Sequence, residues 1–420
     1  MSLFQELKWR DAIKDCNDEK KLEQLLENEK IFFYCGFDPT ASSLTIGHLV
    51  QIIIILLFQK KGHFPIILIG QATGLIGDPK ETKERTLLTS EKNNYNCKKI
   101  QEQLKKFLPS EKIKFVNNYD WISQIDLISF FRKYGKLFNV NYMISKEKIA
   151  KRLNIGISYT EFSYMILQSL DFHQLYKNHN VQLQIGGSDQ WGNITSGLEL
   201  IRKMEFSNKR KIVCGMSIPL LLDSKGIKFG KSENNALWLD AELTSPYQIY
   251  QYFLNIEDSS VIHFLKILTL LEKDKIEELY LLTQKEPRKR KAQQALSQSI
   301  VSFLHGEKIF QECLKVKEIL FIQKKQNISL KDFVLLSKYL VTVEIKEKIN
   351  LIDALVLSQL ADSKKEAKRL IQLGSIKIFN QTINNMNLEL TADDFLYYDK
   401  YIILTKKNKI HALLSLNKNQ

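Results

Sequence analysis

The sequence contains no apolar run long enough to cross a membrane. Its longest wholly apolar stretch extends from Ile52 to Phe58, whereas a membrane-spanning helix needs ~20 such residues. Residues 1–8 show neither a charged stretch followed by an apolar one nor a cleavage site of small residues, which are the marks of a secretory signal. Both observations argue against a membrane or secreted protein, so we expect a cytoplasmic one.

Cysteine, proline and glycine are also scarce. The chain has 5 Cys, 7 Pro and 17 Gly among 420 residues, which excludes a collagen-like or Pro/Gly-rich disordered chain. The cysteines are far apart, odd in number and include no C-x-x-C pair. A disulfide framework or a zinc site needs clustered cysteines, so we expect reduced thiols and no metal site.

The abundant residue types are typical of a globular, basic protein. The composition is 44% hydrophobic and 26% charged, and the length favours two or three domains. Lys and Arg total 61 against 47 Asp and Glu, which gives a net charge of +14. A positive field attracts nucleic acids and nucleotide phosphates. A general enrichment in Ile, Lys and Asn would explain the charge equally well, so charge alone does not decide the function.

Short apolar runs alternate with amphipathic stretches near the beginning of the chain. The apolar runs predict strands at 31–36, 64–70 and 113–116, and the stretches between them predict helices at 47–61 and 90–108. A further strand at 181–187 and a helix at 189–203 follow. Such strands with intervening helices predict a parallel sheet with right-handed crossovers. Ligands bind at the carboxyl ends of such strands, where the loops with Asp38 and Asp78 emerge.

The rest of the chain divides by pattern into further segments. We predict a parallel-sheet domain over 1–240, with a helical insertion at about 120–155, and a helical domain over 241–322. A lysine-rich, weakly periodic stretch at 323–349 is interpreted as a linker. Residues 350–420 predict a small α+β domain, in which a basic helix begins after Ser363 and stops at Gly374. Short strands at 375–379 and 401–405 follow that helix.

Two segments have the residue types that bind an anion. The sequence T-I-G-H at 45–48 opens a predicted helix after a polar loop, and a helix N-terminus offers free N–H groups and a positive dipole. The sequence K-F-G-K-S at 228–232 places two cations around a glycine, so it can close on a polyphosphate. Taken singly, each has a plainer explanation, namely a structural histidine and a solvated charge run.

Three further segments carry polar residues at positions that favour a ligand. They are G-L-I-G-D-P at 74–79, Q-I-G-G-S-D-Q-W-G at 184–192 and the helix predicted over 159–171. On that helix Tyr164, Gln168 and Asp171 are spaced i, i+4 and i+7, so they share one face. Burying unpaired polar groups costs ~1–3 kcal/mol each, which favours a binding site, while a solvated surface stripe is the alternative.

Together these ordered segments resemble the class I aminoacyl-tRNA synthetases and, within them, the bacterial-type tyrosyl-tRNA synthetases. The segment at 45–48 is similar to the H-I-G-H box of that family, and 228–232 is similar to its K-M-S-K-S box. The sequence Y-C-G-F-D-P-T at 34–40 and the three polar segments are similar to its tyrosine and adenylate pockets. The resemblance covers nearly the whole chain.

The resemblance implies both a reaction and a tyrosine site. The family makes tyrosyl-adenylate and pyrophosphate from L-tyrosine and ATP, and then transfers tyrosine to the 3′ end of its tRNA. Two residues are implied to contact the phenolic hydroxyl of the substrate, Tyr34 and Asp171. Three are implied to hold its ammonium group, Asp78, Tyr164 and Gln168.

The resemblance also implies an ATP site. The adenosine and ribose are implied to contact Gly36, Asp38, Gly187, Asp189 and Gln190, and further ATP contacts are implied for Gly47, His48 and Lys231. The residues implied to be catalytic around the phosphates are Thr40, Thr45, His48, Lys228, Lys231 and Ser232. Because the tyrosine carboxylate attacks the α-phosphorus directly, positioning and placed cations suffice without a protein nucleophile. ATP enters as a substrate with Mg²⁺, and no organic cofactor is expected.

Two departures from the family pattern bear on this chemistry. The first histidine of the H-I-G-H box is Thr45 here. Threonine keeps a hydroxyl donor but is shorter and cannot carry charge, so we predict an active enzyme with slowed adenylate formation. The loop at 78–85 is one residue shorter than usual, which leaves open which of Lys80, Lys83 and Arg85 contacts pyrophosphate.

The C-terminal segment resembles the small RNA-binding domain of the S-four type, which is shared with a ribosomal protein. Its basic helix carries four cations that can follow the phosphate backbone of tRNA(Tyr), namely Lys364, Lys365, Lys368 and Arg369. The family forms homodimers, and the apolar, aromatic stretch 130–149 is the candidate interface. The predicted fold class is therefore α/β, with a Rossmann-like catalytic domain, an all-α domain and a small α+β RNA-binding domain.

Three alternatives remain open at this point. A tryptophanyl-tRNA synthetase shares the fold and both ATP boxes, but an indole pocket has no use for a phenol at Tyr34. A catalytically inactive RNA-binding relative is supported only by Thr45. An enzyme that activates another amino acid without tRNA would not need residues 350–420.

Overall fold

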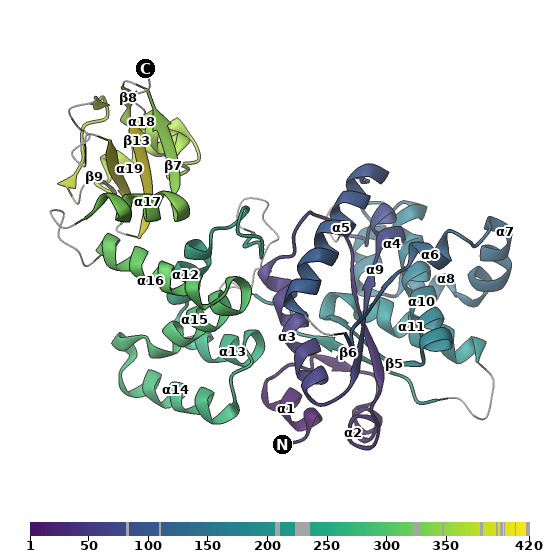
Figure 1. Ribbon diagram of the computed structural model, residues 1–420. Helices are drawn as coiled ribbons and strands as arrows, with labels where there is room; N and C mark the ends of the chain where they lie inside the picture. The colour runs from purple at the N-terminus through teal and green to yellow at the C-terminus, as the bar shows by residue number, and fades with distance from the viewer. Residues whose placement is uncertain are drawn as a thin grey trace. The chain divides into compact units, whose positions relative to one another are not determined.

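The computed structural model describes residues 1–80, 84–108, 111–205, 211–222, 236–321, 328–346, 348–378, 381–391, 394, 398, 400–407 and 409–416 (Figure 1). These residues form two compact units. The first unit contains Met1–Leu243 and Ile256–Leu296, and the second contains Thr244–Asn255 and Ser297–Gln420.

A six-stranded sheet lies at the centre of the first unit, with the strand order β1-β6-β5-β2-β3-β4. Its strands are β1 (Asp15–Cys16), β2 (Phe32–Phe37), β3 (Phe64–Ile69), β4 (Lys114–Asn117), β5 (Val181–Gly187) and β6 (Cys214–Ile218). Every neighbouring pair is parallel except β1 with β6. The parallel sheet predicted from the apolar runs is confirmed.

The helices of the first unit lie around this sheet or, in the case of α13 (Asp258–Leu268) and α14 (Lys273–Lys285), beyond α3 (Ile46–Lys60) (Figure 1). The other longer ones are α1 (Leu3–Trp9), α2 (Glu19–Asn28), α4 (Gln71–Ile76), α5 (Ser90–Phe107), α10 (Tyr159–His179) and α11 (Trp191–Met204). The expected insertion consists of short pieces, α6 (Tyr119–Ile122), α7 (Leu127–Ser129), η1 (Phe130–Tyr134), η2 (Gly135–Leu137), α8 (Val140–Ile144) and α9 (Glu147–Leu153). Single 3₁₀ turns are η3 (Ser188–Gln190) and η4 (Pro287–Lys289).

Helix α3 has almost no polar face, and its packing explains why. It packs on β3 and also on α13, a helix of the segment 256–296. The run from Ile52 to Ile55 is fully buried, as expected of a helix that is apolar on all sides. The segment 256–296 is therefore part of the first unit although it lies far away in the sequence.

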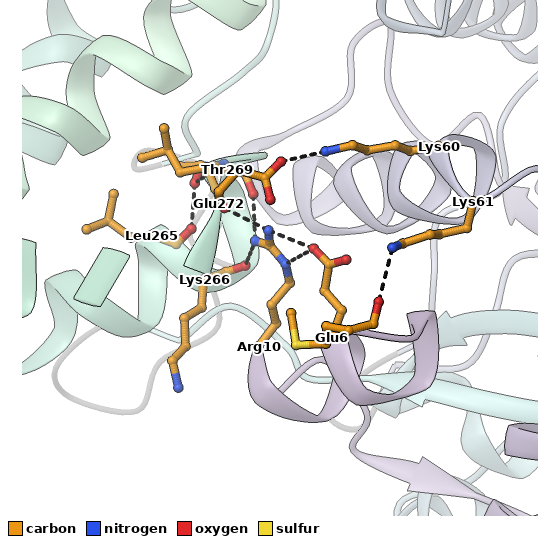
Figure 2. Close-up of polar contacts among 10 residues, drawn as sticks. Glu6, Arg10, Lys60, Lys61, Leu265, Lys266, Thr269 and Glu272 are labelled. Carbon is orange, nitrogen blue, oxygen red and sulfur yellow. Dashed lines mark hydrogen bonds and ion pairs between the residues drawn. The ribbon is translucent and has the colours of Figure 1, made fainter. Parts of the chain in front are cut away.

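A buried arginine fastens that segment to the N-terminal helix (Figure 2). Arg10, which is 1% exposed, donates from Nη1 to the carbonyl oxygens of Lys266 and Thr269 at 2.8 and 2.9 Å. Its Nη2 donates to the carbonyl of Leu271 at 2.8 Å, and its Nε donates to Glu6 Oε1 at 3.1 Å. The guanidinium thus satisfies carbonyl groups at the C-terminal end of α13, where a positive charge is also favoured by the helix dipole.

Replacement of Arg10 by methionine is expected to lower the free energy of unfolding by about 2 kcal/mol, because buried carbonyl oxygens would lose their donors. Urea denaturation followed by circular dichroism measures the change. Lys60→Met is the matched control, since Figure 2 shows Lys60 paired with Glu272 at the surface, where both side chains are more than half exposed. That variant should change stability by less than about 0.5 kcal/mol. Equal effects of the two substitutions would contradict a structural role for Arg10.

The second unit contains helices and a smaller sheet. Its helices are α12 (Pro246–Leu254), α16 (Glu307–Phe321), α17 (Leu330–Tyr339), α18 (Leu351–Leu357) and α19 (Lys364–Gln372), together with the later part of α15 (Lys291–His305). A five-stranded sheet has the order β10-β9-β12-β13-β7 and a two-stranded one pairs β11 with β8. The strands are β7 (Val341–Ile345), β8 (Ile349–Asn350), β9 (Ile376–Ile378), β10 (Gln381–Thr382), β11 (Glu389–Leu390), β12 (Tyr401–Lys406) and β13 (Ile410–Leu416). The α+β character predicted for 350–420 is confirmed.

The linker predicted at 323–349 is wrong for the described part of that range. Residues 330–339 form α17, and β7 runs parallel to β13 as the last strand of the five-stranded sheet. Four of the five residues of β7 are not fully buried. A half-buried edge strand has a weak apolar pattern, and the surrounding lysines made it resemble a linker.

The described residues of 241–322, which we predicted to form a helical domain, contain helices and no strand, but these helices are divided between the two units. Helix α13 belongs to the first unit, where it packs on α3, whereas α12 belongs to the second and packs on α16 and α17. The apolar faces of these helices are similar in sequence, so the pattern does not show which neighbour each face covers. Within the described residues, no helix is both long and apolar enough to span a membrane.

Candidate active site

Polar side chains that follow three parallel strands are hydrogen-bonded to one another. Asp38 comes directly after β2, Thr73 lies on α4 after β3, and Asn118 comes directly after β4. Thr73 Oγ1 donates to Asp38 Oδ1 at 2.8 Å and accepts from Asn118 Nδ2 at 3.0 Å. The carboxyl edge of the sheet therefore carries a connected polar cluster, at the edge where the sequence predicts a ligand site.

Asp171 joins this cluster from helix α10. The carboxylate is 1% exposed and accepts hydrogen bonds from Asn118 Nδ2 at 3.0 Å and Trp121 Nε1 at 2.9 Å. Burial raises the pKa of Asp171 to about 8, although the two hydrogen bonds act in the opposite direction. The two hydrogen bonds thus fix the orientation of the carboxyl group. Burial makes its charged form unfavourable as long as no ligand is bound.

The hydroxyl of Tyr34 is buried and has no hydrogen-bond partner among the residues that the structure describes. Tyr34 lies in the middle of β2, is 1% exposed and packs against Phe172, with 5.4 Å between the ring centroids. Burial, and next the charge of Asp171, raise the pKa of the hydroxyl well above its usual range, so it keeps its proton. The side-chain oxygen of Gln168 is also buried without a partner within the described part of the chain. Buried polar atoms of this kind indicate a place for a polar ligand.

Tyr164 contacts Asp38 rather than standing alone on its helix face. Its hydroxyl donates to Asp38 Oδ2 at 2.8 Å. Burial raises the pKa of Asp38 to about 6, against the lowering effect of the hydrogen bonds from Tyr164 and Thr73. Tyr164 and Asp171 therefore face the polar cluster and not solvent, and the buried Gln168 oxygen on the same helix face is likewise shielded from water.

A second carboxylate group lies where α4 ends. Gly77 adopts φ = 84°, a conformation that only glycine takes without strain, and this turn leads into Asp78. Asp78 Oδ1 accepts from Asn193 Nδ2 at 3.1 Å, and its Oδ2 accepts from Gln190 Nε2 at 3.2 Å and Lys148 Nζ at 2.5 Å. Asp189 Oδ2 lies 4.0 Å from the same Lys148 Nζ.

A buried arginine, together with its partner glutamate, binds the backbone that follows Asp78. Arg152 is 2% exposed and forms an ion pair at 2.9 Å with Glu161, which is 1% exposed. Its Nη1 donates to the carbonyl of Lys80 at 2.7 Å, and Glu161 Oε1 accepts from the backbone N–H of Arg85 at 3.1 Å. Arg85 Nε itself donates to the carbonyl of Asp78. The sequence left open whether Lys80, Lys83 or Arg85 contacts pyrophosphate; Arg85 is held by backbone contacts here, and Lys83 lies outside the described residues.

Helix α3 follows β2 in the chain after a loop, with Thr45 as its N-cap. His48 Nδ1 accepts from the backbone N–H of Thr45 at 3.1 Å and lies 3.0 Å from Thr45 Oγ1. A Cβ built on Gly36 or Gly47 would meet no atom closer than 3.6 Å, so the backbone at both glycines is open to a ligand. Thr40 is exposed in the loop between β2 and α3.

Four predicted active-site residues remain, namely Gly187, Lys228, Lys231 and Ser232. Gly187 ends β5, and a Cβ there would lie 2.6 Å from Asp189 Oδ1, so a larger residue would displace the Asp189 carboxylate. The residues Lys228, Lys231 and Ser232 lie outside the described residues. After that gap, residues 237–239 pair with the start of α3 through Ile46 N–H to Leu237 O at 2.9 Å.

The basic helix of the second unit is α19, which starts at Ser363 as predicted, since the Ser363 side chain accepts from the backbone N–H of Glu366. Its four predicted cations are all exposed. Lys365, Lys368 and Arg369 line a shallow surface depression, while Lys364 pairs with Asp353 at 2.7 Å. The clustering expected of the cations is therefore present on one helix.

Five residues of the site were missed by sequence reasoning: Thr73, Asn118, Trp121, Lys148 and Asn193. Asn118 follows a predicted strand and Asn193 follows a glycine-rich turn after another. Both are therefore polar residues just beyond the carboxyl end of a strand, which is the signal that indicated Asp38. Trp121 and Lys148 belong to the irregular insertion. No periodic signal places their side chains near a distant carboxylate.

The raised pKa of Asp171 predicts a pH-dependent stability. The unfolded carboxyl has a pKa near its usual value of about 3.9, so between pH 4 and 8 the folded protein holds a proton that the unfolded chain releases. The free energy of unfolding of the ligand-free protein should therefore fall as pH rises through this window. In Asp171→Asn the free energy of unfolding should decrease less over this pH range than in the wild type. The difference should be at least about 1.4 kcal/mol, the equivalent of one pKa unit. Urea denaturation at pH 5, 6.5 and 8 measures it, and parallel curves for the two proteins would contradict the prediction.

Comparison with known proteins finds relatives over nearly the whole length of the chain. Residues 26–321 match the family model "tRNA synthetases class I (W and Y)", and residues 332–414 match "Tyrosine--tRNA ligase SYY-like C-terminal domain". The tyrosine–tRNA ligase of Aster yellows witches'-broom phytoplasma (strain AYWB) is 57% identical over 415 residues, which cover 99% of this chain and 100% of that one. Tyrosine–tRNA ligase 1 of Enterococcus faecalis (strain ATCC 700802 / V583) is 42% identical and covers 99% of each chain. The crystal structure of a C-terminally truncated mitochondrial tyrosyl-tRNA synthetase from Aspergillus nidulans superimposes with a TM-score of 0.69 at 26% identity, covering 76% of this chain and 94% of that one.

Proposed function

The chain belongs to the class I tRNA synthetases and, among them, to the tyrosine–tRNA ligase family, and from this premise we propose how its residues perform that reaction. The enzyme activates L-tyrosine with ATP to give tyrosyl-adenylate and pyrophosphate. It then transfers the tyrosyl group to the 3′ end of tRNA(Tyr). Its relatives are bacterial tyrosine–tRNA ligases, and we propose that the enzyme acts in the cytoplasm.

The unpartnered hydroxyl of Tyr34 is the observation that carries the assignment of tyrosine as substrate. A phenolic hydroxyl that enters next to Tyr34 gives this buried group a partner, and it can share a proton with Asp171, whose pKa of about 8 lies close to neutrality. Trp121 and Asn118 already hold the Asp171 carboxyl in place. Phenylalanine would leave the Tyr34 hydroxyl without a partner and would leave Asp171 with only its bonds from Asn118 and Trp121, at a cost of ~1–3 kcal/mol for each missing partner.

The ammonium group of tyrosine is proposed to bind between Asp78, Tyr164 and Gln168. Asp78 supplies a carboxylate, and the Gln168 oxygen is buried without a partner among the described residues. Tyr164 is oriented by its bond to Asp38. An ammonium group has three donors, so it can satisfy an oxygen on each of these side chains.

ATP is proposed to bind between the open glycines and the start of α3. Gly36, Asp38, Gly187, Asp189 and Gln190 are assigned to adenosine and ribose, by resemblance to the family. Gly47 and His48 lie at the N-terminus of α3, where free N–H groups and the helix dipole favour phosphate. Thr40, Thr45 and His48, with Lys228, Lys231 and Ser232, are assigned to the phosphates.

The first step then requires no covalent intermediate with the protein. The tyrosine carboxylate oxygen forms a bond to the α-phosphorus as the bond to the pyrophosphate oxygen breaks. The residues hold the reactants in line and stabilise the charge that moves onto pyrophosphate. ATP is proposed to carry Mg²⁺ with it as part of the substrate.

Two surfaces are proposed to bind macromolecules. The exposed cations of α19 are assigned to the backbone of tRNA. The insertion exposes large apolar side chains, with Leu127 and Ile128 each more than 60% exposed and Phe131 43% exposed. Exposed apolar side chains in such a group favour a protein interface, and we assign it to a second copy of this chain, extending the stretch 130–149 predicted from sequence toward residue 127.

Amino-acid-dependent exchange between ATP and pyrophosphate tests the proposal, with tyrosine, phenylalanine and tryptophan compared. Exchange with tyrosine alone is the expected result. Exchange with tryptophan would mean that Tyr34 and Asp171 do not determine specificity. The absence of exchange with all three would favour an RNA-binding protein that has lost the activity.

A further inference from the structure

Lys148 occupies a position that the reaction as described does not explain. It lies on the short helix α9, and its Nζ is 2.5 Å from Asp78 Oδ2. The side chains of Lys148 and Asp78 are only 21% and 11% exposed. Asp78 is the carboxylate assigned to the ammonium group of the substrate, so an ammonium group of the protein already contacts it.

The contacts of α9 hold Lys148 in this place. Ile149, the next residue, is buried, and Arg152, one turn later, is anchored through Glu161 and the carbonyls of Lys80 and Gly156. Lys148 is thus presented to Asp78 by a fixed helix, unlike a lysine on a long surface loop. Its contact is also shielded from solvent, so the pair is screened less than an exposed one.

The oxygens of Asp78 are nearly fully used in this arrangement. Oδ1 accepts from Asn193 at 3.1 Å, while Oδ2 accepts from both Gln190 at 3.2 Å and Lys148. A second ammonium group at Asp78 would lie close to the first, and like charges at such a distance repel. Asp189 Oδ2 is 4.0 Å from Lys148 Nζ, so a displaced lysine has another carboxylate within reach.

We propose that Lys148 competes with the α-ammonium group of tyrosine for Asp78, and so lowers the affinity of the enzyme for its amino acid. This inference rests on the proposed function, because that function assigns the amine to Asp78. Tyrosine binding displaces Lys148 toward Asp189, and the cost of that displacement appears in the dissociation constant. Ligands without an amine leave the contact between Lys148 and Asp78 intact and do not meet this cost.

Binding of two ligands to the full-length protein tests the proposal by isothermal titration calorimetry without ATP. The ligands are tyrosine and 3-(4-hydroxyphenyl)propionate, which has the phenol and carboxylate but no amine. In Lys148→Gln and Lys148→Met, tyrosine should bind roughly tenfold more tightly, which corresponds to about 1.4 kcal/mol. 3-(4-Hydroxyphenyl)propionate should bind these two variants no more tightly than it binds the wild type. Lys151→Gln is the matched control, because Lys151 lies on the same helix but is about half exposed and pairs with Glu147.

The possible failures can be distinguished. Equal tightening of both ligands would show a general loosening of the site and overturn the competition. An unchanged tyrosine affinity in both Lys148 variants would overturn it too, while tyrosine-dependent exchange by the wild type would leave the proposed function intact. A wild-type protein that neither binds tyrosine nor catalyses exchange would refute the proposed function, and the inference with it.

Discussion

Replacement of Asp171 by alanine is expected to reduce the preference for tyrosine over phenylalanine by roughly 10²- to 10³-fold, measured as the ratio of kcat/KM in the exchange assay. The carboxylate is held by Asn118 and Trp121 in a place closed to water. Near its pKa of about 8, Asp171 can share a proton with the substrate phenol. Bonds to such a partly charged group contribute about 1.5–3 kcal/mol, and a ring without a hydroxyl leaves that side of the buried carboxyl unpaired at a similar cost. The variant removes the first contribution for tyrosine and the second penalty for phenylalanine, so the two effects combine in the ratio.

Tyr34→Phe should reduce the same ratio by about tenfold, because a neutral hydroxyl contributes less than a carboxylate. Its ring should still pack on Phe172, so the substitution tests the hydroxyl alone. Tyr159→Phe is the matched control: it removes a hydroxyl from the exposed start of the same helix that carries Asp171. A preference that survives in the Asp171 variant would mean that the substrate phenol binds elsewhere.

Much of this site follows from sequence because regular elements position it. The i, i+4, i+7 spacing put Tyr164, Gln168 and Asp171 on one helix face, and α10 presents that face to the polar cluster. Asp38 and Asp78 were expected at the carboxyl ends of strands, where backbone topology brings loops together. Periodicity constrains direction within an element, and parallel topology constrains which ends meet.

The residues that were missed depend on contacts between elements with no shared period. Trp121 reaches Asp171 from a helix of a single turn, and Lys148 reaches Asp78 from an irregular insertion. The local sequence pattern does not distinguish either side chain from one that faces solvent. The linker at 323–349 was misread for a related reason, because the partner of β7 is β13, a strand that is remote in the chain. Pairing with a remote partner is settled by tertiary packing, which local pattern does not record.

His48→Ala is expected to lower the rate of adenylate formation by roughly 10²-fold, as is typical when one donor to developing charge is removed. A backbone N–H can only donate, so the bond from Thr45 N–H makes His48 Nδ1 an acceptor. The neutral ring then carries its proton on Nε2, and we expect this N–H to donate to phosphate when ATP binds. Pre-steady-state formation of tyrosyl-adenylate measures the loss, and an unchanged rate would remove His48 from the phosphate site.

Thr45 stands at the position of the first histidine of the family's box, so it determines how many imidazole donors face the phosphates. Its Oγ1 lies 3.0 Å from His48 Nδ1, so in this chain the threonine supports the histidine, but its short side chain has no imidazole to serve as a second donor to phosphate. Thr45→His should therefore raise the rate of adenylate formation by about tenfold, since an added donor contributes about 1.4 kcal/mol in the transition state. Thr45→Val, which keeps the shape but loses the hydroxyl, should lower the rate and leave the KM for tyrosine unchanged. If the histidine variant were no faster than the wild type, the hydroxyl of Thr45 would already meet the whole requirement at this position. The slow activation predicted from the altered box would then be wrong.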